Sequence, residues 1–268
     1  MESITDRGYL RGEQYRDGRN LNVRVQLHER FSVHTENPNR WMLRRLAVSP
    51  TARVLEVGAG LGHFWRDTRD LRPAGWQVLW SDLSPGMVAE AHTALAGESG
   101  FSFLAADVQD LPLPEASVDL VLANFMFYHV PDRPRALAEI RRVLHPGGTF
   151  AAMTVGARHM AGIRDLVQRF APEHPADAAA PSANFLLENG AAQLEPFFEA
   201  VQVERLPNAL AITEAAPLVD YVRSMWNYAD AIVGREAAFS TFVAQEIAAH
   251  GAIHSPKEVG VLIGRRAE

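Results

Sequence analysis

Short apolar runs alternate with amphipathic and polar segments along most of the chain. The runs have the length of buried strands, and several segments between them carry apolar residues at helical spacing. Strands that alternate with helices at this spacing are typical of a parallel sheet. The pattern therefore predicts an α/β fold with strands at residues 52–58, 77–83, 101–108, 118–125, 148–155, 198–206 and 258–266.

Helical segments precede and connect these strands. Residues 136–148 carry apolar residues at helical spacing and then His-Pro-Gly-Gly, which indicates a crossover helix that ends before the next strand. The pattern changes after residue 155, where an Ala- and Pro-rich stretch at 171–184 is a candidate lid. We expect the other helices at residues 21–31, 40–47, 160–170, 185–196, 214–228 and 234–250.

The length of 268 residues, 47% of them hydrophobic, suits one large domain with a cap. We expect an N-terminal helical arm or cap over residues 1–50 and a main domain over residues 51–268. Lid or cap insertions are expected near residues 156–197 and 207–257, because the sequence there is helical and lies between late strands.

Charge and composition exclude several classes of function. A formal net charge of −6 gives no basic surface for nucleic acid. The absence of cysteine excludes disulfides, thiolate zinc sites, cysteine-bound iron–sulfur clusters and thiol nucleophiles. The first 20 residues are rich in charge, and no apolar run approaches the roughly 18 residues of a membrane span. We therefore expect a cytoplasmic protein that binds neither nucleic acid nor a membrane.

A glycine-rich loop follows the first strand, in the sequence VLEVGAGLGHFW at residues 54–65. Gly58, Gly60 and Gly62 permit a tight turn and a close approach of the backbone to a ligand. The dinucleotide fingerprint GxGxxG needs a glycine at the position of His63. The spacing therefore argues against an NAD-dependent oxidoreductase.

Acidic residues close the next two strands. Asp82 lies 24 residues after Gly58, where its carboxylate can accept hydrogen bonds from both ribose hydroxyls of an adenosine. Asp107 can accept one from the adenine amino group, while Val108 packs on the ring. The alternative is that each aspartate only caps a helix, and that Glu56, before the loop, only orients it.

Four motifs in order resemble those of class I S-adenosylmethionine-dependent methyltransferases, near the ubiquinone-biosynthesis-type group with small-molecule acceptors. They are EVGAGLG from residue 56, SDLSPGM from residue 81, AADVQDLP from residue 105 and RRVLHPGGTF from residue 141. The likeness is close over residues 52–155 and implies a Rossmann-like, mostly parallel sheet of strand order 3-2-1-4-5-7-6. It also implies S-adenosylmethionine as cofactor, with the glycine loop at its methionine portion, Asp82 at the ribose and Asp107 at the adenine. The expected cofactor-binding residues are Glu56, Gly58, Gly60, Gly62, Asp82, Leu83, Met87, Asp107, Val108 and Asn124.

The end of the fourth strand should face both cofactor and methyl acceptor, since ligands bind at the carboxyl ends of such strands. His129 is the candidate general base there, because imidazole titrates near neutral pH. A hydrogen bond to the cofactor or the backbone is its alternative role. The preceding run Asn124-Phe-Met-Phe127 lacks the [DN]-P-P-[YF] motif of enzymes that methylate amino groups of nucleic acids. Phe125 to Tyr128 form either an apolar wall or ordinary strand core.

In the resembled family the variable flanks, here residues 1–45 and 156–257, build the acceptor pocket. Tyr15 is a candidate to close over the sulfonium, and a solvated arm is the alternative. The aromatic residues at 221–228 either stack on a planar acceptor or pack between helices. Aromatic and histidine candidates in the flanks are Tyr9, Tyr15, His28, His34, Tyr221, Trp226 and Tyr228.

No HExxH pair occurs among the ten histidines, so we expect transfer without a metal. The sequence thus predicts an S-adenosylmethionine-dependent methyltransferase. It would act on an oxygen or nitrogen, with carbon also open, of a small apolar or aromatic molecule by in-line displacement. The alternative is a catalytically silent S-adenosylmethionine-binding partner or scaffold. The large cap favours catalysis, since a scaffold would not need it.

Overall fold

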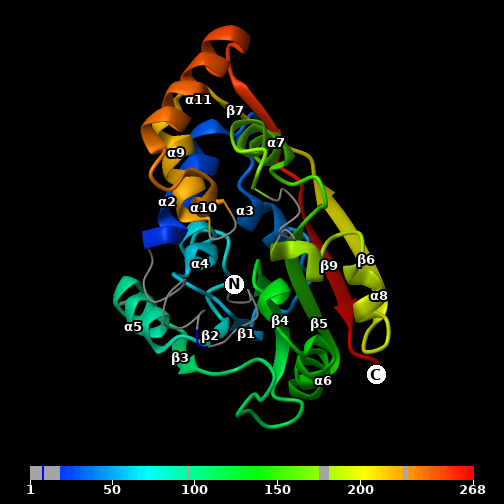
Figure 1. The fold of residues 1–268 in the computed structure, drawn as a ribbon. Helices are drawn as coiled ribbons and strands as arrows, with labels where there is room; N and C mark the ends of the chain where they lie inside the picture. The colour runs from blue at the N-terminus through cyan, green and yellow to red at the C-terminus, as the bar shows by residue number, and fades with distance from the viewer. Residues whose placement is uncertain (1–7, 9–18, 96, 175–180, 226–227) are drawn as a thin grey trace.

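A computed structural model describes residue 8 and residues 19–95, 97–174, 181–225 and 228–268. Its main sheet has seven strands in the order β3-β2-β1-β4-β5-β9-β6 (Figure 1). The strands β1 to β5 pair in parallel, and β9 is antiparallel to both β5 and β6. The predicted order is therefore confirmed, with β6 and β9 as the sixth and seventh strands. The bounds are β1 Arg53–Val57, β2 Gln77–Asp82, β3 Phe101–Ala105, β4 Val118–Asn124, β5 Leu144–Val155, β6 Glu199–Leu206 and β9 Val259–Arg265.

Helices bury both faces of this sheet, which is why its strands read as continuous apolar runs. Val54 of β1 belongs to one core, and its neighbour Leu55 belongs to the core on the opposite face. The first core includes α3 (Pro38–Leu43), α4 (His63–Asp67) and α5 (Pro85–Ala94). The second includes α6 (Arg133–Val143) and α8 (Gly190–Leu194).

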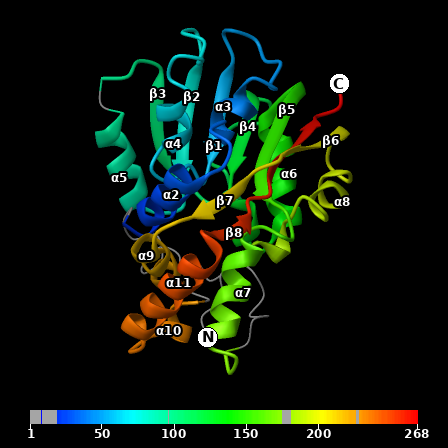
Figure 2. The same ribbon diagram turned by 90° about the horizontal axis from the view of Figure 1, so that it is seen from above.

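A cap with its own hydrophobic core lies at one end of the sheet (Figures 1 and 2). Buried residues such as Leu27, Ile163, Leu218 and Phe239 come from segments far apart in the sequence. The cap elements are α2 Arg19–Phe31, α7 Ala161–Phe170, β7 Ala209–Ile212, α9 Ala215–Ser224, α10 Ala229–Ile232, α11 Glu236–His250 and β8 Ile253–Pro256.

The sequence pattern did not predict the ribbon of β7 and β8. These strands have four residues each and pair across more than 40 positions of chain, Ala209 with Pro256 and Ile212 with Ile253. Such short strands carry no alternation that would identify them. A single bridge between Ser32 and Leu210 joins the ribbon to the segment after α2.

Several expected boundaries also differ from the structure: the helix expected at 40–47 is α3 at Pro38–Leu43, and the third strand ends at Ala105 and not at residue 108. The fifth strand begins at Leu144 and not at residue 148, because Leu144 pairs with Val118 before an irregularity in the register. The helix expected at 185–196 is shorter, since Asn189 accepts a hydrogen bond from the Leu186 amide and makes a turn before α8. Of the candidate lid at 171–184, residues 175–180 lie outside the described part of the chain. How the chain divides into domains stays a prediction.

Across the residues that the structure describes, no helix combines the length and apolar character needed to cross a membrane.

Candidate functional site

A cavity of about 630 Å³ lies between the carboxyl ends of the central strands and the cap. Its lining combines the loops after β1, β2, β3 and β4 with residues of α2, α7 and α9. Nine of the ten expected cofactor-binding residues belong to this lining, so the structure brings them together; Gly62 is the exception. Their roles stay predictions.

The glycine loop leaves β1 in a conformation that favours glycine. Gly58, Gly60 and Gly62 have φ angles of +61°, +58° and +69°. A Cβ atom on Gly58 would lie 2.7 Å from Cγ of Met126. The loop therefore needs glycine at this position for its backbone angle and for the close approach of β4's end.

Asp82, at the end of β2, holds the glycine loop. Its Oδ2 accepts a hydrogen bond from the Gly60 amide at 3.0 Å, and its Oδ1 accepts one from the Ser84 amide at 2.8 Å. Burial raises the pKa of Asp82, while the backbone N–H groups of Ser84, Gly60 and Leu83 oppose this shift. Each carboxylate oxygen can accept more than one hydrogen bond, so the group can fix the loop and bind a hydroxyl together.

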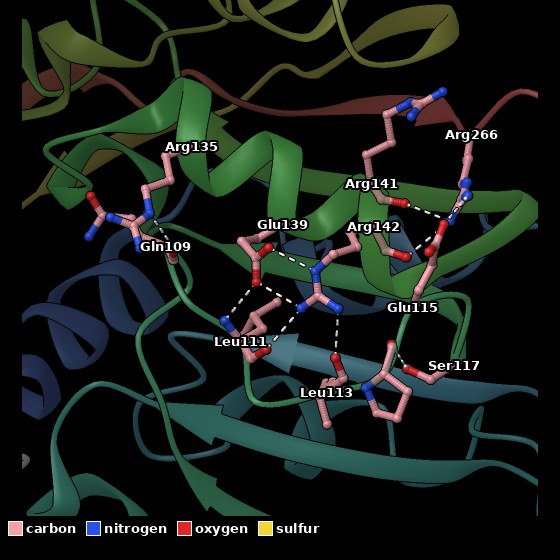
Figure 3. A network of polar contacts seen from close by, with 11 residues as sticks. Gln109, Leu111, Leu113, Glu115, Ser117, Arg135, Glu139, Arg141, Arg142 and Arg266 are labelled. Carbon is pink, nitrogen blue, oxygen red and sulfur yellow. Dashed lines mark hydrogen bonds and ion pairs between the residues drawn. The ribbon is translucent and has the colours of Figure 1, made fainter.

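The segment after β3 carries Asp107 and is fastened to α6. The Asp107 carboxylate accepts hydrogen bonds from the backbone and side chain of Gln109. Figure 3 shows how the segment continues: Arg142 donates to the carbonyls of Leu111 and Leu113, and Glu139 accepts from the Leu111 amide. This network fixes the loop that places Asp107 and Val108 in the cavity wall.

Glu56 and Asn124 form a buried polar pair at the floor of the cavity. Asn124 Nδ2 donates to Glu56 Oε1 at 2.8 Å. Glu56 is only 1% exposed, and burial raises its pKa to about 8. Glu56 Oε2 and Asn124 Oδ1 are also buried and accept no hydrogen bond of ordinary length among the described residues, although the Trp65 side chain is near enough to oppose the rise in the pKa of Glu56. Buried polar atoms of this kind are usually satisfied, so both are available to a ligand.

The end of β4 turns sharply into the cavity. Phe125 has a φ of +54°, a strained value for a residue with a side chain. Phe125, Met126, Tyr128 and His129 line the cavity, whereas Phe127 is fully buried in the core. The run from Phe125 to Tyr128 therefore gives the cavity an apolar wall and, at Phe127, also contributes to the core. His129 lies in the cavity wall, as a general base requires, but its role stays a prediction.

The cap supplies the other end of the cavity. His28, His34, Tyr221 and Tyr228, all expected from the flanks, belong to its lining. Tyr9, Tyr15 and Trp226 lie outside the residues that the structure describes.

Sequence reasoning missed several ionisable residues of this cap end. Arg24, His159, Arg164 and Lys257 line it, and none belongs to a recognisable motif. One signal was present, because Lys257 is the only lysine in a chain with 25 arginines.

The sheet end of the cavity fits S-adenosylmethionine. The buried and unpartnered oxygens of Glu56 and Asn124 suit a ligand that carries N–H donors, as an amino acid portion does. The two strand-end carboxylates suit ribose hydroxyls and an adenine amino group. Within the described ranges, no three His, Asp or Glu side chains form a cluster that could hold a metal ion.

Comparison with known proteins agrees with this geometry. Residues 55–152 match the family described as methyltransferase domain. A malonyl-[acyl-carrier protein] O-methyltransferase of Methylococcus capsulatus is 36% identical over 115 residues, which are 43% of this chain and 42% of that protein. A demethylmenaquinone methyltransferase of Clavibacter sepedonicus is 31% identical over 161 residues, 58% of this chain and 61% of that protein. The chain thus spans less than two thirds of the length of these relatives.

A solved structure with the same fold is the YcgJ protein of Bacillus subtilis. It has a TM-score of 0.59 at 18% identity and covers 86% of this chain and 98% of that one. Sheet order, site geometry and family match point the same way. Residues 55–152 therefore match a methyltransferase domain, and they lie within a Rossmann-like sheet that β6 and β9 complete.

Proposed function

We propose that the chain transfers a methyl group from S-adenosylmethionine to an oxygen or nitrogen of a small apolar or aromatic molecule. One observation carries this proposal. A single cavity joins the glycine loop and the strand-end carboxylates to a cap end lined by aromatic rings and histidines. Carbon stays open as the accepting atom, since the curated relatives include a ubiquinone/menaquinone biosynthesis C-methyltransferase of Acidiphilium cryptum as well as O-methyltransferases.

The residues of the chain chiefly bind and orient. Asp82 would accept from the ribose hydroxyls, Asp107 from the adenine amino group, and the Glu56–Asn124 pair from the amino acid portion. The bound cofactor supplies an electrophilic methyl group on its sulfonium. Holding an acceptor in line with that methyl in a cavity shielded by the cap can contribute on the order of 7–11 kcal/mol to lowering the barrier.

His129 would take the proton when the acceptor atom must lose one. A positioned base adds about 10²–10⁴ in rate. Replacement by alanine should lower kcat by that factor and remove an ionisation from the pH profile, while binding of S-adenosylhomocysteine stays unchanged. Equal rates and profiles for variant and wild type would reduce His129 to packing or binding.

Calorimetric titration with S-adenosylmethionine, S-adenosylhomocysteine and NAD, each alone, tests the proposal first. We expect binding of the first two only. Binding of NAD, or of none of the three, would overturn it. A protein that binds the first two but transfers no methyl group across an acceptor screen would be the silent partner or scaffold instead.

Asp82→Ala should lower the affinity for S-adenosylhomocysteine at least about tenfold, because hydrogen bonds to a charged group contribute roughly 1.5–3 kcal/mol each. Asp220→Ala is a matched control, since Asp220 is 58% exposed on α9 and does not line the cavity. Equal affinity of the two variants would contradict the site map.

A further inference from the structure

Lys257 is the only lysine of the chain, and it is buried. It lies between β8 and β9, its backbone amide donates to the Asn208 carbonyl, and its residue is 7% exposed. Its side chain belongs to the lining of the cavity at the cap end. A lysine is seldom buried unless its charge is compensated.

The ammonium of Lys257 has little compensation within the chain. Nζ donates to Ser32 Oγ at 2.9 Å, and that hydroxyl in turn donates to the His28 carbonyl. Among the described residues, no carboxylate lies within 4 Å of Nζ and no second acceptor binds it. An ammonium has three N–H donors, so two are left for a ligand. Burial lowers the pKa of Lys257, and the more distant Glu29 only partly opposes this shift.

Two imidazoles line the same end of the cavity as Lys257. His28 and His159 stack with ring centroids 5.8 Å apart. Burial lowers both pKa values, that of His159 to about 4. His159 lowers the pKa of His28 further, and the charge of Lys257 adds to both shifts, so both rings are neutral near pH 7. The Nδ1 atoms of both rings are buried and have no hydrogen-bond partner among the described residues.

Cations outnumber carboxylates at the cap end of the cavity. Arg24 and Arg164 also line this end, and neither guanidinium has a carboxylate within 4 Å in the described part of the chain. Glu29 and Glu36 line it too, but Glu36 pairs with Arg44, and Glu29 only partly offsets the burial of Lys257. The sheet end carries the carboxyl groups of Glu56, Asp82 and Asp107. An anionic group therefore finds its electrostatic complement only at the cap end.

We propose that the cap end binds an anionic oxygen group of the methyl acceptor, held by Lys257 beside the stacked rings of His28 and His159. The inference rests on the proposed function and narrows its substrate class to small acids, either carboxylates or phosphate monoesters. The anionic oxygen would accept the hydrogen bonds of the Lys257 ammonium that no described group of the chain accepts. A neutral acceptor would leave the Lys257 charge buried without a counter-ion, which is unfavourable.

The single lysine allows a direct test by NMR. Protein grown with ε-¹³C-lysine gives one side-chain signal, and it is titrated with benzoate, phenyl phosphate and acetate in the presence of saturating S-adenosylhomocysteine. We expect a saturable shift with at least one anion and none with benzamide, the neutral analogue of benzoate. The anion that shifts the signal identifies the class. No shift with any anion, or an equal shift with benzamide, would overturn the inference.

Variants separate this inference from the proposed function. Lys257→Met keeps an unbranched side chain that is one atom shorter and carries no charge. It should weaken binding of the effective anion at least about tenfold, as expected when a charged hydrogen bond is lost. Arg223→Met removes the same charge from an exposed site on α9 outside the cavity lining and should have no such effect. Both variants should bind S-adenosylhomocysteine as wild type does. If wild type fails to bind S-adenosylhomocysteine, the proposed function is rejected. If the two variants bind the anion with equal affinity, only the anion site is rejected.

Discussion

The site geometry requires glycine at position 58 for two reasons. Its φ is positive, and any Cβ would clash with Met126. Gly97 shares the positive φ, at +91°, but a Cβ there would meet nothing within 4 Å. Gly97→Ala should therefore cost only about 1 kcal/mol of backbone strain. Gly58→Ala should cost more stability, measured by urea unfolding, and should also lower the affinity for S-adenosylhomocysteine, measured by calorimetry. Similar losses for both variants would refute the role assigned to the close approach.

The raised pKa of Glu56 makes a prediction about stability and pH. In the folded protein without a bound ligand Glu56 keeps its proton up to about pH 8, whereas in the unfolded chain it ionises near pH 4.5. The unfolded state therefore loses this proton first, and the contribution of Glu56 to stability falls as pH rises from about 4.5 to about 8. Glu56→Gln should remove this fall, so the variant should gain stability relative to wild type between pH 5 and pH 8 in urea unfolding.

Glu139 gives a control of opposite sign. The hydrogen bond from Arg142 lowers its pKa, so its contribution is present above its unfolded pKa and is lost as pH falls through the lower folded value. Glu139→Gln should change the stability profile only in acid. A Glu56→Gln profile parallel to wild type from pH 5 to pH 8 would show that Glu56 is ionised in the folded state.

At the scale of elements, the sheet was predictable and the cap was less so. The strands of the main sheet are buried on both faces, so each appears in the sequence as an apolar run between loops. The glycine loop and Asp82 could be predicted because each lies at the end of such a strand. β7, β8 and Lys257 could not, because their places depend on contacts between the cap and distant segments. No local pattern records those contacts.

The network between α6 and the segment after Asp107 makes an element-scale prediction. Arg142→Leu removes hydrogen bonds to Leu111, Leu113 and Glu139 and should cost about 1–3 kcal/mol of stability. It should also speed amide hydrogen exchange at residues 109–113. Arg141→Leu is the control, since the Arg141 side chain makes no hydrogen bond or ion pair to the described residues. Unchanged exchange in Arg142→Leu would mean that the segment does not depend on this network.

For the whole molecule, separate cores predict separate effects of cavity-creating substitutions. Phe239 is fully buried in the cap core, and Phe150 is fully buried beside Phe127 in a sheet core. Either residue replaced by alanine should cost about 3–5 kcal/mol. Phe239→Ala should leave the affinity for S-adenosylhomocysteine close to wild type, while Phe150→Ala, which undermines the end of β4, should weaken it. Calorimetry on folded samples measures both affinities. An equal loss of affinity in the two variants would contradict the separation of the cap core from the sheet core.

The place of β9 has a consequence for how the chain folds during synthesis. β9 lies between β5 and β6, so β6 has no partner in the sheet until residues 259–265 are available. The ribosome releases this strand after every other element of the described chain. The half-built sheet therefore exposes the edge of β5 while translation continues, and unpaired edges favour aggregation. A chaperone that shields this edge, or slow expression at low temperature, should raise the yield of folded protein.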